Sequence, residues 1–151
     1  MDRQRPPYVP TSDAALSAML DCAQPLEHEL AFDLGCGDGR LLIESTRLYK
    51  TRGIGVELDK EVAALARAAV NSAGLTHAID IEVEDLFETD LEDADIVYCY
   101  LNQYLMAQLE EKFERELKDA RVISHHFELP HKKASALSQQ VRGSRIFVYR
   151  Y

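Results

Sequence analysis

The chain has 151 residues, of which 46% are hydrophobic, and a formal net charge of −9. This length suits a single domain with a sizeable core, and the negative charge argues against a dedicated nucleic-acid-binding protein, which would need a basic face. No apolar run is long enough to cross a membrane. The three cysteines lack CxxC spacing, which favours reduced thiols. We therefore expect a cytoplasmic, non-membrane protein with one domain over residues 1–151.

Helix and strand patterns alternate along the chain. A helix is predicted from a cap at Thr11 or Ser12 to about Cys22. Two further helices have predicted inner faces that include Leu48 and Leu65, and a fourth follows the fourth strand. Strands are predicted over residues 30–34, 53–57, 79–83, 94–101 and 121–129, followed by a hairpin of 136–141 and 145–151.

This alternation predicts right-handed βαβ units and a parallel sheet. The near-continuous apolar run over 94–101 suits a strand that is covered on both faces. The C-terminal hairpin adds an antiparallel edge. The expected fold class is therefore α/β, a doubly wound and mostly parallel seven-stranded sheet with an antiparallel C-terminal hairpin.

Three glycines, Gly35, Gly37 and Gly39, alternate in the stretch FDLGCGDGR, which ends the first predicted strand and opens the next helix. Glycine lets the backbone turn sharply and approach a ligand with no Cβ in the way. Open α/β sheets bind their ligands at the carboxyl ends of the strands. The loop therefore predicts a nucleoside-binding turn, although its spacing alone fits several cofactors.

Charge distinguishes among these cofactors. The dinucleotide fingerprint G-x-G-x-x-G places a pyrophosphate over a helix N-terminus, but here the third glycine comes one residue early, at Gly39, and Arg40 follows it. Asp33 precedes the loop and Asp38 lies within it, so a pyrophosphate would meet carboxylates. A ligand with a cationic amine and no phosphate suits this charge, and S-adenosylmethionine is such a ligand. A nicotinamide-dependent oxidoreductase is the disfavoured alternative.

Two further acids follow the next two predicted strands. Glu57 ends the second strand, where a carboxylate can accept hydrogen bonds from both ribose hydroxyls, as the acid of dinucleotide sites does. Asp85 comes just after the third strand and precedes the apolar Leu86 and Phe87, a combination that suits an adenine. Each acid alone would more often be a surface acid or a helix cap, but together they predict a nucleoside site.

The motif D-L-G-C-G-D-G, the acid that ends the second strand and E-D-L after the third resemble those of the class I, Rossmann-like, S-adenosylmethionine-dependent methyltransferases. The resemblance covers nearly the whole chain and implies that fold and cofactor. It implies that Glu57, beside Leu58, holds the ribose and that Asp85 with Leu86 holds the adenine. The residues implied for the methionine part are Asp33, Gly35, Cys36, Gly37, Asp38 and Gly39.

The segment Tyr8-Val9-Pro10-Thr11 and the helix after it resemble the N-terminal motif of the small archaeal protein-lysine methyltransferases. Mitochondrial relatives of these enzymes modify an ATP synthase subunit and an adenine nucleotide carrier. The resemblance implies that residues 1–24 form a segment and helix that cover the cofactor, with Tyr8, Val9 and Thr11 in contact with it. It also implies a lysine side chain as methyl acceptor.

The acceptor is expected at the end of the fourth strand, in residues 98–104. This stretch lacks the Asn/Asp-Pro-Pro-Tyr/Phe signature of enzymes that methylate planar amides or exocyclic amines, and it is similar to the channel of the non-SET histone lysine methyltransferases. Tyr100, Asn102 and Tyr8 are the predicted catalytic residues, and Tyr100 is also predicted to contact the cofactor. Because Tyr98 and Tyr100 share a face, one is expected to line the pocket while the other packs under the sheet.

The negative charge suits a protein substrate with accessible lysines in basic segments. We expect no stable nucleic-acid binding and a monomer or weak dimer. We also expect no metal site, because the pair His125–His126 lacks ligand spacing. Two alternatives stay open at this point: a methyltransferase that acts on RNA or a small molecule, and a non-catalytic S-adenosylmethionine-binding module that regulates a partner.

Overall fold

The structure is a computed structural model that describes residues 8–135, 138–141 and 143–151. Three predicted features therefore lie partly outside the described residues: the N-terminal segment at 1–7, the hairpin strand at 136–137 and the hairpin turn at 142. The described helices are α1 (Asp13–Ala23), α2 (Arg40–Tyr49), α3 (Lys60–Ser72) and α4 (Gln103–Glu116). The described strands are β1 (Leu30–Leu34), β2 (Arg52–Glu57), β3 (Ile79–Val83), β4 (Ile96–Cys99), β5 (Arg121–His125), β6 (Gln139–Val141) and β7 (Ser144–Arg150).

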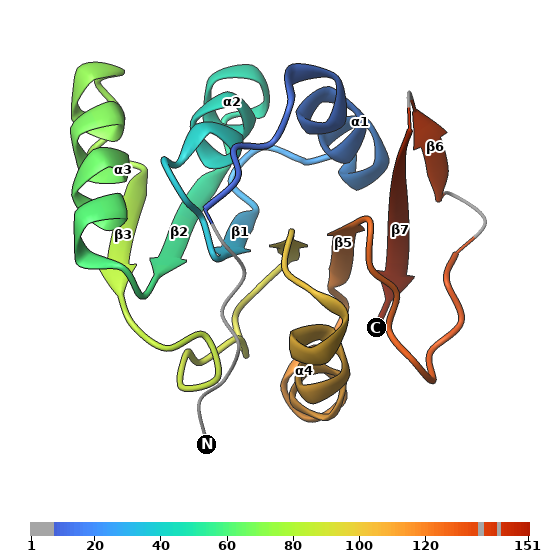
Figure 1. Cartoon of the computed structure of the whole chain (residues 1–151). Helices are drawn as coiled ribbons and strands as arrows, with labels where there is room; N and C mark the ends of the chain where they lie inside the picture. The colour runs from blue at the N-terminus through green and yellow to red at the C-terminus, as the bar shows by residue number, and fades with distance from the viewer. Residues whose placement is uncertain (1–7, 136–137, 142) are drawn as a thin grey trace.

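The strands form one seven-stranded sheet in the order β3-β2-β1-β4-β5-β7-β6 (Figure 1). Strands β1 to β5 pair in parallel, whereas β7 is antiparallel to both β5 and β6. The order reverses between β1 and β4, and such a reversal opens a crevice at the carboxyl ends of the strands. The predicted fold class, including the antiparallel C-terminal hairpin, is confirmed.

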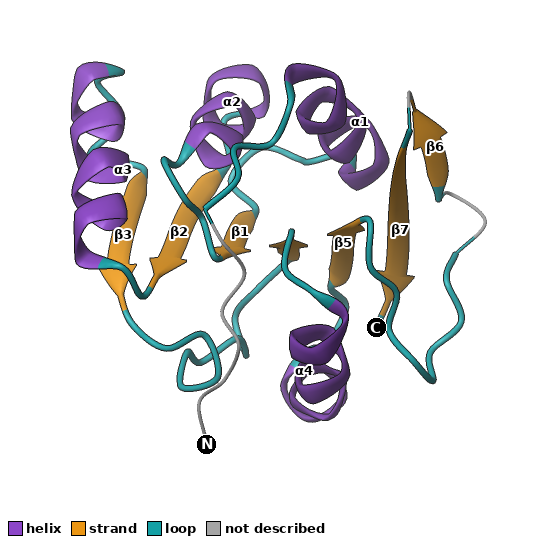
Figure 2. Cartoon of the chain, viewed as in Figure 1, coloured by secondary structure: helices purple, strands orange, loops and turns teal. Residues whose placement is uncertain are grey.

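Helices cover both faces of the sheet, as Figure 2 shows, with α1, α2 and α3 on one face and α4 on the other. Successive side chains of a strand point to opposite faces of the sheet, so the core is divided into one cluster on each face. In β1, Ala31 packs in the cluster formed with α1 to α3. Phe32 and Leu34 point to the opposite face and pack with α4. This double cover explains why β1 and β4 are almost entirely apolar.

Strands β4 and β5 are shorter than predicted, and β6 covers Gln139–Val141 instead of 136–141. Strand β4 covers Ile96–Cys99 instead of 94–101, and β5 ends at His125 instead of 129. After β4 the chain leaves the sheet because Asn102 already caps α4. After β5 it turns at His126, which has a left-handed backbone with φ of 79°. Because both strands end early, Tyr100 and His126 directly follow the carboxyl ends of β4 and β5 and are not part of these strands.

Two leucines that were expected on inner helix faces are exposed. Leu48 of α2 is 63% exposed and Leu65 of α3 is 56% exposed. On α3 the buried stripe instead runs through Ala63 and Ala66. The glycine loop approaches this stripe closely, because a Cβ added at Gly39 would lie 3.5 Å from the Cβ of Ala66. Small side chains therefore occupy the inner face of α3, and the larger Leu65 turns to the outside.

Within the described residues, none of the helices combines the length and the apolar composition that a membrane crossing requires.

Candidate functional site

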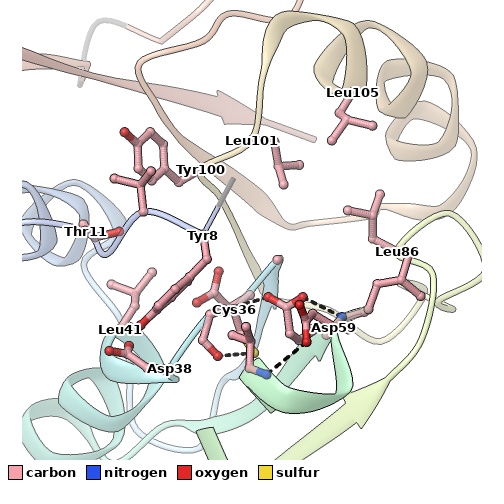
Figure 3. A pocket seen from close by; sticks show the side chains of 18 of the residues that line it. Tyr8, Thr11, Cys36, Asp38, Leu41, Asp59, Leu86, Tyr100, Leu101 and Leu105 are labelled. Atoms are coloured by element: carbon pink, nitrogen blue, oxygen red, sulfur yellow. Dashed lines mark hydrogen bonds between the residues drawn. The ribbon is translucent and has the colours of Figure 1, made fainter. Parts of the chain in front are cut away.

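A cavity of about 1150 Å³ opens at the carboxyl ends of the parallel strands. Its walls come from the loops that follow β1, β2, β3, β4 and β5, together with the segment before α1 (Figure 3). This is the edge at which the strand order reverses, so the cavity lies where the topology predicts a ligand.

Nearly all the predicted site residues line this one cavity. The exception is Gly39, which packs against Ala66 of α3 and permits the helix to approach the loop. Contact of the lining residues with a ligand stays a prediction. The predicted residues in the wall are Tyr8, Val9, Thr11, Asp33, Gly35, Cys36, Gly37, Asp38, Glu57, Leu58, Asp85, Leu86, Tyr100 and Asn102.

The glycine loop has the conformation that its composition suggests. Gly35, Gly37 and Gly39 all have left-handed backbones, with φ of 76°, 56° and 81°, which side-chain-bearing residues adopt only at a cost. The backbone N–H groups of Gly35 and Cys36 donate to the carbonyl oxygen of Val56 at 2.8 and 3.0 Å. These bonds tie the start of the loop to the end of β2. The loop is thereby held in a turn that leaves its inner side open to the cavity.

Backbone amides hold Glu57 in place at the end of β2. Its Oε1 accepts a hydrogen bond from the N–H of Gly37 at 3.3 Å, and its Oε2 accepts one from the N–H of Asp59 at 3.0 Å. Asp59 in turn caps α3. A carboxylate has about four lone-pair sites, so Glu57 keeps the capacity to accept hydrogen bonds from two hydroxyl groups in the cavity.

Asp33 is the most perturbed acid of the cavity. Its side chain is buried, and burial raises its pKa to about 7, with further contributions from the charges of Glu57 and then Asp38. A buried carboxylate next to like charges is costly to ionise unless a cation compensates it. The arrangement therefore favours a ligand that brings a positive charge to this end of the cavity.

The sequence argument counted Asp38 as a carboxylate that would repel a pyrophosphate, but in the structure its charge is compensated. Arg40 grips its carboxylate: Nε lies 3.1 Å from both Oδ1 and Oδ2, and Nη2 lies 2.6 Å from Oδ2. These hydrogen bonds lower the pKa of Asp38. Because Arg40 offsets its charge, Asp38 adds little repulsion toward a phosphate. The electrostatic argument for a cationic ligand rests instead on Asp33 and Glu57.

The segment before α1 lies over the glycine loop, and Figure 3 shows Tyr8 pointing toward Asp38. Burial, and then the nearby carboxylate of Asp38, raises the pKa of Tyr8. The ring covers Gly37 so closely that a Cβ there would lie 2.8 Å from Tyr8 Cε2. Nη1 of Arg40 donates to the carbonyl oxygen of Thr11 at 3.2 Å. The segment therefore lies at the cavity, and its contact with a cofactor stays a prediction.

Asp85 shapes the far end of the cavity. Its Oδ1 accepts a hydrogen bond from the N–H of Phe87 at 2.9 Å, a local turn that aspartate readily forms. This turn presents Leu86 and Phe87 as apolar walls beside the carboxylate. An aromatic ring with an exocyclic amine suits such a slot, as expected for adenine.

The opposite wall is aromatic. The ring of Tyr100 lies on that of His125, with 4.2 Å between centroids, and His126 and Phe127 continue the row, 4.9 Å apart. Burial, and then the charge of His126, lowers the pKa of His125. Tyr98 is wholly buried in the core cluster formed with α1 to α3, whereas Tyr100 lines the cavity.

Asn102 has a structural task. Its Oδ1 accepts a hydrogen bond from the N–H of Leu105 at 2.9 Å and so caps α4, a common use of asparagine. The same residue lines the cavity. Its predicted catalytic role therefore stays a prediction beside a cap that orients the side chain.

The prediction missed several wall residues. Their signal was weak, because they are ordinary apolar or basic residues whose place depends on strand ends and helix contacts. One clue was available for His126 and Phe127. They directly follow β5, and residues that follow a parallel strand lie at the edge of the sheet where ligands bind. The missed residues include Met19, Arg40, Leu101, Leu105, His126 and Phe127. Among the described residues, no group of three or more histidine, cysteine or acidic side chains is arranged to hold a metal ion.

Comparison with known proteins agrees with this geometry. Residues 33–136 match the family model described as the ANTKMT methyltransferase domain. A protein-lysine N-methyltransferase of Saccharolobus islandicus is 35% identical over 82% of this chain and 78% of its own. The adenine nucleotide translocase lysine N-methyltransferase of mouse is 30% identical over 85% of this chain, which spans 56% of that protein.

A solved structure is similar over almost its full length. The crystal structure of an RNA methyltransferase from Salinibacter ruber, in complex with S-adenosyl-L-homocysteine, is 29% identical with a TM-score of 0.91. The similarity covers 94% of this chain and 93% of that one. The names of these proteins therefore agree on methyl transfer and differ on the acceptor.

Proposed function

We propose that this chain, which belongs to the ANTKMT methyltransferase-domain family, transfers a methyl group from S-adenosylmethionine to the side-chain amine of protein lysines. The observation that carries the proposal is the pairing of the acidic floor of the cavity with its aromatic wall. The floor is formed by Asp33 and Glu57, and the wall by Tyr100, His126 and Phe127. The similarity to a protein-lysine N-methyltransferase over most of both chains supports the acceptor.

The residues fit the cofactor. Asp33 needs a compensating cation, which the α-ammonium group would provide, and Glu57 retains acceptors for ribose hydroxyls. Asp85 and the apolar Leu86 suit the adenine. The glycine loop leaves room for the methionine part. When bound, S-adenosylmethionine supplies an electrophilic methyl group on a sulfonium centre.

The aromatic wall suits a lysine acceptor. A lysine ammonium has a pKa of roughly 10.4 and is a poor nucleophile while protonated. Removal from water lowers that pKa and favours the neutral amine. The faces of Tyr100 and Phe127 attract methylated ammonium groups through cation–π contact. These residues then act mainly by excluding water and aligning the amine for in-line attack, so a strong general base is not required.

RNA is the second candidate acceptor, because the Salinibacter ruber structure is described as an RNA methyltransferase and is similar over nearly the full chain. The net charge of −9 opposes it, since RNA backbones bind basic surfaces. The aromatic wall is chemically suited to either a lysine or an unstacked base. We rank RNA below protein on charge.

Label transfer separates the two candidates. The purified protein is incubated with methyl-tritiated S-adenosylmethionine and an extract depleted of endogenous cofactor, and each sample is then treated with ribonuclease or protease. We expect the label to become acid-soluble only after protease. Loss of label with ribonuclease would overturn the lysine assignment and leave the methyltransferase family intact.

We propose further that the protein works in the cytoplasm as a monomer or weak dimer. All three cysteines are free and buried, which suits a reducing compartment. The negative surface would draw basic, lysine-rich segments of a substrate protein. Stable nucleic-acid binding is not expected at this charge.

A further inference from the structure

We propose that Arg40 is a positioning residue that fastens the N-terminal strap, residues 8–12, over the cofactor cavity and thereby slows release of the cofactor and its product. The inference rests on the cofactor part of the proposed function and is independent of the acceptor. Arg40 lines the cavity. Its position there is explained by its protein partners and does not require a carboxylate or phosphate of a ligand.

Arg40 joins two segments that are far apart in sequence. Its Nε and Nη2 grip the carboxylate of Asp38, with the shortest contact at 2.6 Å, while Nη1 donates to the carbonyl oxygen of Thr11 at 3.2 Å. Asp38 belongs to the glycine loop and Thr11 to the strap. One rigid guanidinium thus holds the strap to the loop through three of its nitrogen atoms.

Tyr8 supplies a second attachment at the glycine loop. Its ring covers Gly37, and the nearby carboxylate of Asp38 adds to the effect of burial in raising the pKa of its hydroxyl. Asp38 therefore lies between the two attachments, gripped by Arg40 and next to Tyr8. If the Arg40 side chain is removed, Asp38 loses the guanidinium and keeps the backbone N–H of residue 40 at 3.2 Å. The attachment of the strap at Thr11 is then lost.

Apolar burial alone gives the strap a weak hold. Tyr8 is 45% exposed and Val9 is 52% exposed, so about half of each residue remains in water. A segment with little buried surface opens at low free-energy cost. The polar attachments at Thr11 and Asp38 are then the contacts that decide how often the strap opens.

Lysine cannot replace Arg40 in this task. A guanidinium offers five donors in a fixed planar fork, so it can bind a carboxylate with one edge and a carbonyl with another nitrogen. An ammonium is a single point charge that would retain the attraction to Asp38 without bridging to Thr11. Charge alone contributes little here, because the Arg40 side chain is 39% exposed and water screens such pairs.

Release of S-adenosyl-L-homocysteine tests the proposal. Dissociation is followed by stopped-flow displacement for the wild type, Arg40→Lys, Arg40→Met and Tyr8→Phe. Arg47→Met is the matched control, because Arg47 lies on the same helix and pairs with Glu44 on the surface, away from the cavity. Circular dichroism and thermal melting verify that each variant is folded.

We expect Arg40→Met to raise the dissociation rate about tenfold, as for one lost hydrogen bond to a charged group, and Arg40→Lys to raise it nearly as much. Tyr8→Phe should raise it less, and Arg47→Met should match the wild type. Amides of residues 9–13 should also exchange faster in Arg40→Met with product bound. Folded Arg40 variants that release the product at the wild-type rate would overturn the proposal that Arg40 fastens the strap. If these rates are as expected but no lysine is methylated, the assignment of lysine as acceptor is overturned and the proposed task of Arg40 is not.

Discussion

Asp33 of β1 and Glu57 at the end of the adjacent strand β2 both line the cavity, and the charge of Glu57 acts on the carboxyl group of Asp33. Burial, and then the charge of Glu57, raises the pKa of Asp33 to about 7. This pair is the electrostatic centre of the site. It favours a cationic ligand, and it predicts that ligand binding depends on proton release near neutral pH.

Product affinity should therefore rise with pH. A ligand ammonium favours the ionised form of Asp33, so below pH 7 binding must also remove a proton. The dissociation constant for S-adenosyl-L-homocysteine should fall as pH rises from 5.5 to 7, by at most about tenfold per pH unit. Titration calorimetry at several pH values across this range measures the dissociation constant. In Asp33→Asn the dependence should flatten, and an equally steep dependence in that variant would assign the proton to another group.

The stability of the ligand-free protein should change in the opposite direction. Because the pKa of Asp33 is raised on folding, the unfolded chain loses this proton at lower pH than the folded one. The contribution of Asp33 to the free energy of unfolding is therefore full below about pH 4 and is lost as pH rises through about 7. Asp33→Asn should raise the melting temperature at pH 8 and change it little at pH 4.5. A variant that melts lower than wild type at pH 8 would contradict this.

Gly37 and Tyr8 should be energetically coupled. Alanine at position 37 must adopt φ of 56° and place its Cβ 2.8 Å from the Tyr8 ring, so Gly37→Ala should displace the strap and weaken product binding about tenfold. In a Tyr8→Ala background the clash is absent, and the same substitution should cost much less. A double-mutant cycle of product affinities measures the coupling. Additive effects would show that the ring does not cover the loop in solution.

Tyr100 should act through its ring. The ring lies on His125 and faces the cavity, so Tyr100→Phe should keep kcat within about threefold, because cation–π contact does not need the hydroxyl. Tyr100→Ala should lower kcat at least about tenfold, because it opens the wall and misplaces the amine. Steady-state kinetics with saturating cofactor separates the two. A Phe variant as impaired as the Ala variant would instead assign a task to the hydroxyl.

Much of the site could be predicted from local signals. The acids Asp33 and Glu57 and the glycines at 35, 37 and 39 stand at or just after the ends of β1 and β2, two strands whose ends the hydrophobic pattern predicts correctly. The parallel sheet then brings these ends to one edge. Prediction therefore succeeded wherever chain-local patterning and topology were enough.

The rest depends on contacts between distant segments. The bond from Arg40 to Thr11 spans 29 positions in sequence, and the compensation of Asp38 by Arg40 requires a rotamer that no pattern specifies. Likewise, Leu65 turns outward because Gly39 brings α3 close to the loop. The aromatic row beyond Tyr100 forms because β5 ends at His125, four residues earlier than the apolar pattern suggests.

The most direct test of the central claim is amino-acid analysis of a labelled acceptor. A purified lysine-rich protein is incubated with methyl-tritiated S-adenosylmethionine and either wild-type enzyme or Glu57→Ala, hydrolysed in acid, and resolved by chromatography. We predict methyl-lysine from the wild type and at least about tenfold less from Glu57→Ala, which loses the acceptor for ribose hydroxyls. Label recovered in any residue other than lysine, or in equal amount from both enzymes, would contradict lysine methylation at this cavity.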